Sequence, residues 1–183
     1  MLLRFASLAA MLGLCVAVAS ADDSALKVKV GDAFPNVPLK AAQVEKLPGK
    51  KAGDTVSIAD LKGKTVVVFF YPKALTKGCT IESCGYRDLA KDFPEGSVIL
   101  GASADTVEKQ KEFIDTNSLP YPLLADTEMK LIKDLGIVHP KNAKMSQRVT
   151  FVIGKDGKIA KIYEVDMVAP HPKQVLEFVK TQK

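Results

Sequence analysis

The sequence has few cysteines, few arginines and no long apolar run. Its 183 residues include three cysteines, too few for a small domain that is held together by disulfides. Only three of the 26 basic residues are arginines (Arg4, Arg87 and Arg148), and the lysines are scattered, which argues against a nucleic-acid-binding surface. The longest apolar run, residues 8–18, falls short of the ~20 residues that span a bilayer. We therefore expect neither a nucleic acid nor a membrane as a partner.

What the chain does have is the composition of an ordinary globular domain. It is 47% apolar and 26% charged, a balance that excludes a disordered tail, a collagen-like fibre and a polytopic membrane protein. It contains no internal repeat and no low-complexity tract. We expect one domain over residues 22–183.

The first 21 residues have the pattern of a secretory signal peptide. Arg4 precedes the apolar run, and Ala19-Ser20-Ala21 forms a small-x-small end, which predicts cleavage after Ala21. A membrane anchor is disfavoured by the short run, and a lipoprotein anchor on Cys15 by the bulky residue before it. The predicted location is therefore periplasmic or secreted, where a disulfide between the two remaining cysteines, Cys79 and Cys84, can persist.

Hydrophobic periodicity divides the rest of the chain into strands and helices. The run Thr65–Tyr71 is apolar on both faces, which predicts a central, buried strand. After Pro72 the period changes to that of a helix. Further strands are expected over residues 97–103, 121–125, 148–153 and 158–163, further helices over 106–116 (with Asp105 as its cap), 128–135 and 171–181, and small strands before residue 64.

This order of elements predicts an α/β fold. Strands alternate with helices, and a hairpin around Gly154–Gly157 then precedes the last helix. The order contains the thioredoxin pattern, β-α-β followed by β-β-α. We expect a thioredoxin-like fold in which a central mixed β-sheet is flanked by helices on both faces.

Cys79 lies where the central strand gives way to a helix. With Thr76 as the N-cap, Cys79 occupies the third helical position. Unpaired backbone N–H groups and the positive end of the helix dipole meet there, and both favour the thiolate over the thiol. The alternative is a buried, inert cysteine.

Cys84 follows Cys79 by five residues on the same predicted helix. This spacing separates their Cα atoms by roughly 8–9 Å, whereas a disulfide needs less than about 7 Å. The pair can therefore bridge only if the helix unwinds, and Gly85 weakens the helix at that point by ~1 kcal/mol. Such a pair is typical of redox chemistry rather than of a structural disulfide; the alternative is two thiols that never meet.

The two arginines that follow the predicted leader are, after the two cysteines, the third indication of thiol chemistry. Arg87 shares the helix with Cys79, and Arg148 begins a predicted core strand. Because arginine is favoured where a fixed fork of donors must meet an anion, either could lie beside the Cys79 thiolate. The alternative is a surface ion pair, for Arg87 with Glu82 or Asp88.

The stretch from Tyr71 to Asp88, YPKALTKGCTIESCGYRD, resembles the peroxiredoxin family, whose signature matches Pro72-x-x-x-Thr76-x-x-Cys79 here. The fuller run is similar to the bacterioferritin-comigratory (PrxQ-type) subgroup, and the likeness extends from about residue 31 to the C-terminus. Two segments depart from it: residues 138–147 lack an aromatic residue and a Tyr-Gly pair, and the loop 47–54 is extended. The departures bear on oligomeric contacts and on the choice of reductant.

The resemblance implies a thiol peroxidase that reduces hydrogen peroxide and organic hydroperoxides without a metal or organic cofactor. It assigns the peroxidatic role to Cys79 and the resolving role, through an intramolecular disulfide, to Cys84. A thioredoxin-like dithiol is the implied reductant, and a monomer the implied state. The other matched positions are the residue that shields the thiolate, the hydroxyl that bonds the peroxide, the arginine that orients it and that arginine's partner: Pro72, Thr76, Arg148 and Glu82.

Two other functions are compatible with a pair of thiols. An exported thioredoxin-like disulfide oxidoreductase would normally carry Cys-x-x-Cys, whereas four residues intervene here. A copper- or zinc-binding module would need a histidine beside Cys79 and Cys84. Only His139 and His171 exist, and both stand next to proline in what we interpret as surface loops.

Overall fold

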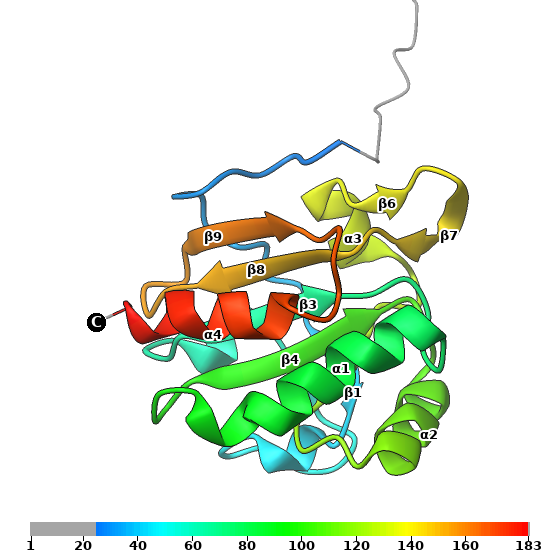
Figure 1. Ribbon diagram of the computed structural model, residues 1–183, viewed down its shortest axis with the longest axis horizontal. Coiled ribbons are helices and arrows are strands. Elements are labelled where there is room, and N and C mark those ends of the chain that lie inside the picture. The colour runs from blue at the N-terminus through cyan, green and yellow to red at the C-terminus, as the bar shows by residue number, and fades with distance from the viewer. Residues whose placement is uncertain (1–24, 183) are drawn as a thin grey trace, which may run out of the picture.

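The computed structural model describes residues 25–182 (Figure 1). Within this range the strands of the main sheet follow the order β2-β1-β5-β4-β3-β8-β9. Their bounds are Leu39–Ala42 (β1), Thr55–Val56 (β2), Val66–Phe70 (β3), Val98–Ser103 (β4), Leu123–Ala125 (β5), Val149–Ile153 (β8) and Ile159–Glu164 (β9). β3, β4 and β5 run parallel, whereas β8, β9, β1 and β2 each pair antiparallel with their neighbours. The sheet is therefore mixed, as predicted.

β3 is an interior strand of the sheet, between β4 and β8. All five of its residues are buried, because apolar side chains on both of its faces pack against helices. It pairs in parallel with β4 and antiparallel with β8, with Phe70 opposite Val149. This register places the residues after β3, where the first long helix starts, beside Arg148, which immediately precedes β8.

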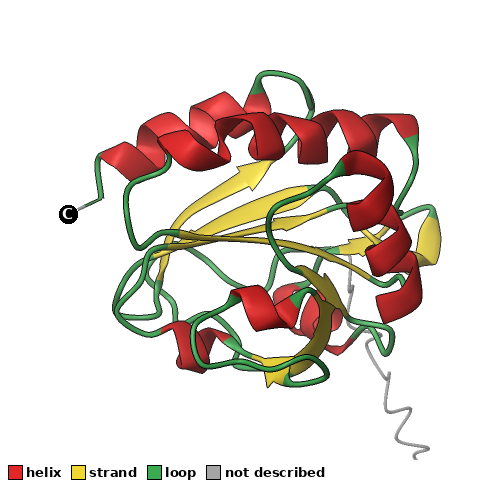
Figure 2. Ribbon diagram, turned by 90° about the horizontal axis from the view of Figure 1, so that it is seen from below, coloured by secondary structure: helices red, strands yellow, loops and turns green. Residues whose placement is uncertain are grey.

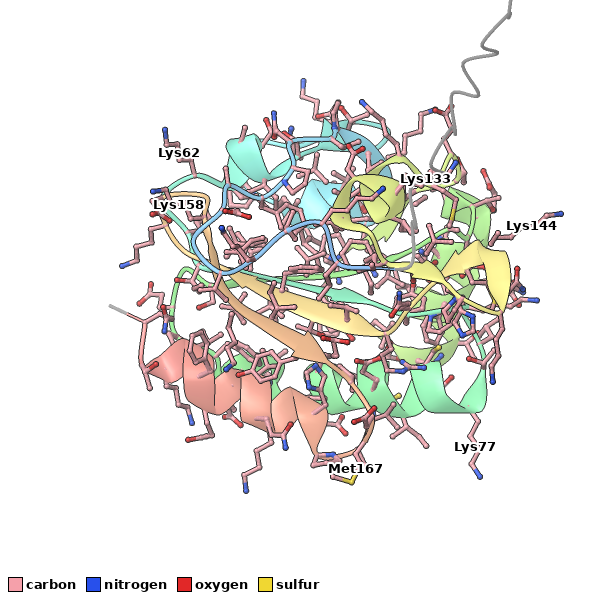
Figure 3. The ribbon with its side chains drawn as sticks, turned by 90° about the horizontal axis from the view of Figure 1, so that it is seen from above. Lys62, Lys77, Lys133, Lys144, Lys158 and Met167 are labelled. Atoms are coloured by element: carbon pink, nitrogen blue, oxygen red, sulfur yellow. The ribbon has the colours of Figure 1, made fainter. Side chains whose placement is uncertain are left out.

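Helices cover both faces of the sheet (Figure 2). They are α1 (Lys77–Leu89), α2 (Val107–Asn117), α3 (Lys130–Leu135) and α4 (His171–Lys180), with short 3₁₀ helices at Val44–Lys46, Ile58–Leu61 and Ala90–Asp92. One core joins α1, α2 and α4 to one face of β3, through side chains such as Tyr86, Phe113 and Val175. A second core joins α3 and the first two 3₁₀ helices to the other face. The predicted three layers are confirmed.

The hairpin of β8 and β9 closes the sheet at one edge. The two strands pair antiparallel, and Gly157 has a φ of 81°, a left-handed conformation that favours glycine. Gly136 similarly ends α3 in the left-handed region. Gly157 thus lies in the turn of the hairpin that the sequence predicts.

A second, smaller hairpin was not predicted. β6 (Val138–His139) pairs with β7 (Asn142–Ser146) and lies at the end of the molecule where α1 begins (Figure 1). Its side chains are mostly exposed, so the segment has no apolar alternation to reveal a strand. The Ser146 hydroxyl donates to the Tyr71 carbonyl at 3.0 Å, which fastens the hairpin beside the end of β3.

The cap of α2 also differs from the prediction. Thr106, not Asp105, is the N-cap, and its hydroxyl accepts from the Lys109 N–H. The Asp105 carboxylate instead accepts from the Ala74 N–H at 2.8 Å and from the Ser103 hydroxyl at 2.8 Å. A tertiary contact with the loop before α1 thus outweighs the local capping position.

Within residues 25–182, every helix is too short or too polar to cross a lipid bilayer.

Candidate active site

Cys79 occupies the first turn of α1. The N-cap is Thr76, so Cys79 is the third helical residue, as predicted. The backbone N–H groups of the first three helical residues have no partner within the helix; the Thr80 N–H is the first to close a turn, on the Thr76 carbonyl. Cys79 itself is only 1% exposed, and in such a setting nearby dipoles and charges act on the sulfur with little screening.

Arg148 lies directly against this sulfur. Its Nη2 donates to the Cys79 Sγ at 3.2 Å, and its Nη1 donates to the Glu82 carboxylate. A Cβ at Gly78 would come within 3.4 Å of the same Nη2, so the glycine leaves room for the guanidinium. Burial disfavours the Arg148 cation, but the charges of Glu82 and Cys79 outweigh it and raise the Arg148 pKa. The expected arginine is therefore in place, held between two groups that attract it.

Thr76 and Pro72 belong to the loop between β3 and α1. The Thr76 side chain does not cap the helix; its hydroxyl donates to the Lys73 carbonyl at 2.9 Å. Pro72 is half-buried two residues after the end of β3. Leu75 has a φ of 63°, an unfavourable left-handed conformation for a leucine. The bond from the Ala74 N–H to Asp105 helps to hold this shape, a role that the sequence did not reveal.

Glu82 is completely buried beneath Arg148. Burial raises its pKa to about 7, although the charge of Arg148 and the hydrogen bond from it act in the opposite direction. Its Oε2 accepts from Arg148, whereas Oε1 has no hydrogen-bond partner. The carboxylate therefore uses only one of its two oxygens to hold the arginine.

His171 is not a surface residue, contrary to the prediction. It is 2% exposed and begins α4. Its Nε2 lies 2.8 Å from the Thr150 hydroxyl, 3.1 Å from the Tyr86 hydroxyl and 4.0 Å from the Glu82 Oε1. The adjacent Pro172 suggested a loop, but His171 lies four and eight residues before two buried residues of α4, Val175 and Val179. This spacing is the signal for a buried helix face.

Cys84 is half-buried further along α1, and both cysteines are free thiols. The two lie on one uninterrupted helix, the arrangement in which they are too far apart to bridge. The Cys84 Sγ is 3.8 Å from the Asn117 Oδ1 at the end of α2. Arg87 forms an ion pair with Asp88 and donates to the Asn117 carbonyl, so it is Arg148 alone of the two that contacts Cys79.

No group of three or more His, Cys, Asp or Glu side chains in residues 25–182 is arranged to hold a metal ion. His171 faces Glu82 rather than a cysteine, and His139 is half-buried in β6. The metal-binding alternative therefore lacks a ligand set in the described part of the chain.

Comparison with known proteins supplies the identity. Residues 30–162 match the AhpC/TSA family. The chain is 34% identical over 161 residues to "Peroxiredoxin Bcp" of Bacillus subtilis, covering 85% of this chain and 97% of the relative. The chain is a peroxiredoxin. "Peroxiredoxin Bcp" of Escherichia coli is 33% identical over 152 residues, which cover 78% of this chain and 97% of that protein.

A solved structure extends this peroxiredoxin likeness to the fold. "Peroxidoxin BcpB" of Mycobacterium tuberculosis superposes with a TM-score of 0.73 at 31% identity, over 85% of this chain and 98% of that one. The resemblance to the bacterioferritin-comigratory, PrxQ-type subgroup and the thioredoxin-like fold are both confirmed. The chain is accordingly a thiol peroxidase.

The comparisons overturn the predicted export of this peroxiredoxin. The alignments cover 97% of both the B. subtilis and the E. coli relatives, which leaves no stretch of either that could correspond to a leader of 21 residues. The prediction of a periplasmic or secreted protein is therefore wrong, and the thiol chemistry below does not rely on an oxidising compartment. The predicted leader and its boundary at Ala21 lie outside the described residues.

Proposed function

We propose that this peroxiredoxin reduces hydrogen peroxide and organic hydroperoxides with Cys79 as the peroxidatic residue. The observation that carries the proposal is the 3.2 Å contact between the Arg148 Nη2 and the Cys79 Sγ at the start of α1. A fixed guanidinium and the unpaired N–H groups of a helix N-terminus both stabilise a thiolate. They also donate to the negative charge that develops on the peroxide oxygens as their bond breaks.

In the first step, the Cys79 thiolate attacks one peroxide oxygen. An S–O bond forms and the O–O bond breaks, and the departing hydroxide or alkoxide takes up a proton and leaves as water or an alcohol. The sulfur is oxidised by two electrons to a sulfenic acid, and the peroxide is reduced by the same two electrons. This step needs neither a metal nor an organic cofactor.

Thr76 and Pro72 complete the proposed site. The Thr76 hydroxyl donates its hydrogen bond to the Lys73 carbonyl, so its lone pairs remain to accept a hydrogen bond from the O–H of an incoming peroxide. Pro72, which has no N–H, shields the other side of the thiolate from water. Glu82 acts through Arg148, whose second nitrogen it holds.

In the second step, the Cys84 thiol resolves the sulfenic acid. The S–S bond forms as the S–O bond breaks, and the hydroxyl leaves as water with the proton of Cys84. Because both cysteines share α1, part of this helix must first unwind. A thioredoxin-like dithiol then reduces the disulfide in two exchange reactions and is itself oxidised.

The test is catalytic peroxide consumption by the purified protein in the presence of a thioredoxin-type donor. We expect turnover with the unaltered protein, no turnover with Cys79→Ser, and almost none with Cys84→Ser. Reduction of a disulfide substrate without peroxide consumption would contradict the proposal and favour a disulfide oxidoreductase. Full turnover by Cys84→Ser with the same donor would remove Cys84 from the cycle.

A further inference from the structure

A buried polar cluster lies behind the residues assigned to the chemistry. The two oxygens of Glu82 have different neighbours: Oε2 accepts from Arg148, whereas Oε1 faces His171 at 4.0 Å. His171 comes from α4, far from the Cys79 motif in the sequence, yet it is as buried as the catalytic cysteine. Neither the proposed peroxide step nor the resolving step uses it.

We propose that His171 is a positioning residue of the peroxidase site: it closes the buried side of Glu82 and so fixes the carboxylate that holds Arg148 against the Cys79 sulfur. The proposal rests on the function proposed above. It assigns to α4 a part in the chemistry of α1, through the hydrogen bond between His171 and Tyr86 and the close approach of His171 to Glu82.

The imidazole nitrogen that faces the carboxylate, Nε2, is also held by two hydroxyl groups. It lies within hydrogen-bond distance of the Thr150 hydroxyl on β8 and the Tyr86 hydroxyl on α1, and the imidazole ring packs edge-on against Tyr86 and Tyr163. His171 thus spans three elements, β8, α1 and α4. Because Thr150 of β8 lies two residues after Arg148, the contact also links His171 to the arginine that it indirectly supports.

His171 works as a neutral group. Burial, with a contribution from the charge of Arg148, lowers its pKa to about 4, so its approach to Glu82 is not an ion pair near neutral pH. A neutral Nε2 either accepts hydrogen bonds or carries one proton. It therefore offers the buried Oε1 a polar neighbour without adding a second positive charge that would compete with Arg148.

This neighbour controls the protonation of Glu82. Oε1 is the oxygen without a partner, so the proton that Glu82 binds belongs there, facing His171. Four side chains from the surrounding elements face the carboxylate, and the Cys79 sulfur lies beyond the first of them: Arg148 just before β8, Tyr86 on α1, Tyr121 ahead of β5 and His171 on α4. An ionised Glu82 competes with the Cys79 thiolate for the positive charge of Arg148. A neutral Glu82 does not compete, so the charge of the guanidinium then acts mainly on Cys79.

The experiment compares His171→Gln with His171→Leu. A glutamine amide can donate to Oε1 and stabilise the carboxylate, so the pH at which Glu82 titrates falls by about one unit; leucine leaves Oε1 against an apolar group, so that pH rises by about one unit. The Glu82 titration is followed directly by ¹³C NMR of labelled glutamate, assigned with Glu82→Gln. It is followed independently as the Glu82-dependent inflection in the rate of peroxide reduction against pH.

Val179→Ala is the matched control. Val179 lies on the same buried face of α4, two turns beyond His171, so this variant weakens the packing of α4 without touching Glu82. We expect it to lower the melting temperature and to leave the Glu82 titration unchanged. If His171→Leu does not fold, the shift to lower pH in His171→Gln decides the question alone.

Two failures have different meanings. A folded His171→Gln whose Glu82 titrates at the same pH as the unaltered protein would overturn the role of His171, whatever its activity. An unaltered protein that does not consume peroxide would overturn the proposed function, whereas the NMR titration would still report on His171.

Discussion

At the scale of single residues, the site depends on the two terminal nitrogens of one guanidinium. The Arg148 Nη2 donates a hydrogen bond to the Cys79 sulfur, and its Nη1 donates one to Glu82. A planar guanidinium can make both bonds at the same time. Lysine carries the same charge at a single nitrogen and cannot span both partners in this way. The position of the charge, and not the charge alone, is what the site requires.

We therefore expect Arg148→Lys to slow the reaction of Cys79 with peroxide by roughly tenfold to a hundredfold. The measurement is the second-order rate of a single oxidation by hydrogen peroxide. Arg87→Lys is the matched control, because Arg87 lies on the same helix as Cys79 but bonds to Asp88 and Asn117. Equal rates for Arg148→Lys and the unaltered protein would remove the arginine from the site.

At the scale of elements, the proposed resolving step requires the local unwinding of α1. Contacts from neighbouring elements oppose it near Cys84: the Tyr121 hydroxyl donates to the Ser83 carbonyl at 2.6 Å, and the Arg87 Nη1 donates to the Asn117 carbonyl at 2.8 Å. On the other side, Gly85 packs against Pro172 of α4. In the proposed cycle, these contacts keep the helix intact until Cys79 is oxidised.

Tyr121→Phe removes one of these contacts without changing the ring. Because a hydrogen bond of this kind contributes about 1 kcal/mol, we expect the Cys79–Cys84 disulfide to form about fivefold faster after a pulse of peroxide. The rate is measured by quenching with a thiol-alkylating reagent. Tyr71→Phe, which loses a buried hydroxyl bonded to Gln110 of α2, should leave this rate unchanged; an equal acceleration in both variants would contradict a specific effect on α1.

In Gly85→Ala, a gain in helix propensity is opposed by a steric clash with α4. Alanine favours a helix interior by ~1 kcal/mol over glycine, but its Cβ would lie 2.8 Å from the Pro172 Cγ. A proline ring has little freedom to move aside, and overpacking of this kind costs about 1–3 kcal/mol. We expect a net loss of stability in urea unfolding, and a gain would show that α4 yields more easily than the contact suggests.

At the scale of the whole molecule, two buried groups make stability depend on pH in opposite directions. The pKa of Glu82 is raised from 4.5 to about 7, so its contribution to the free energy of unfolding is complete below pH 4.5 and is lost as the pH rises through 7. The pKa of His171 is lowered from 6.5 to about 4, so its contribution is complete above pH 6.5 and is lost as the pH falls through 4. The two effects oppose each other between these limits.

The variant Glu82→Gln separates the effect of Glu82 on the pH dependence of stability from that of His171. Because the amide does not titrate, the variant lacks the decline that Glu82 causes as the pH rises from about 4.5 to about 7. Relative to the unaltered protein, its free energy of unfolding should therefore increase over this window, even though its absolute value is lower for want of the Arg148 ion pair. Urea unfolding at a series of pH values tests this, and parallel curves for the two proteins would contradict the raised pKa of Glu82.

The sequence predicted the parts of this molecule that periodicity and local chemistry determine. The buried strand β3 and the Thr76 N-cap follow from an apolar run and a helix start. The scarcity of arginine left Arg87 and Arg148 as candidates for the neighbour of Cys79, and the resemblance to peroxiredoxins assigned the role to Arg148. The hairpin of β6 and β7 was missed because exposed short strands have no apolar alternation. His171 was placed at the surface because the adjacent Pro172 suggested a loop, although the spacing from His171 to Val175 is that of a buried helix face. The contact of Asp105 with Ala74 depends on which strands become neighbours, which no local pattern specifies.

The proposed mechanism depends most on the Cys79 sulfur being the atom that peroxide oxidises first. The most direct measurement treats Cys84→Ser with one equivalent of hydrogen peroxide, labels sulfenic acid with a dione reagent and locates the label by mass spectrometry. We expect a single label, on Cys79, and none on a protein that also carries Cys79→Ser. Failure of Cys84→Ser to acquire any label while the unaltered protein still consumes peroxide would contradict the proposed mechanism.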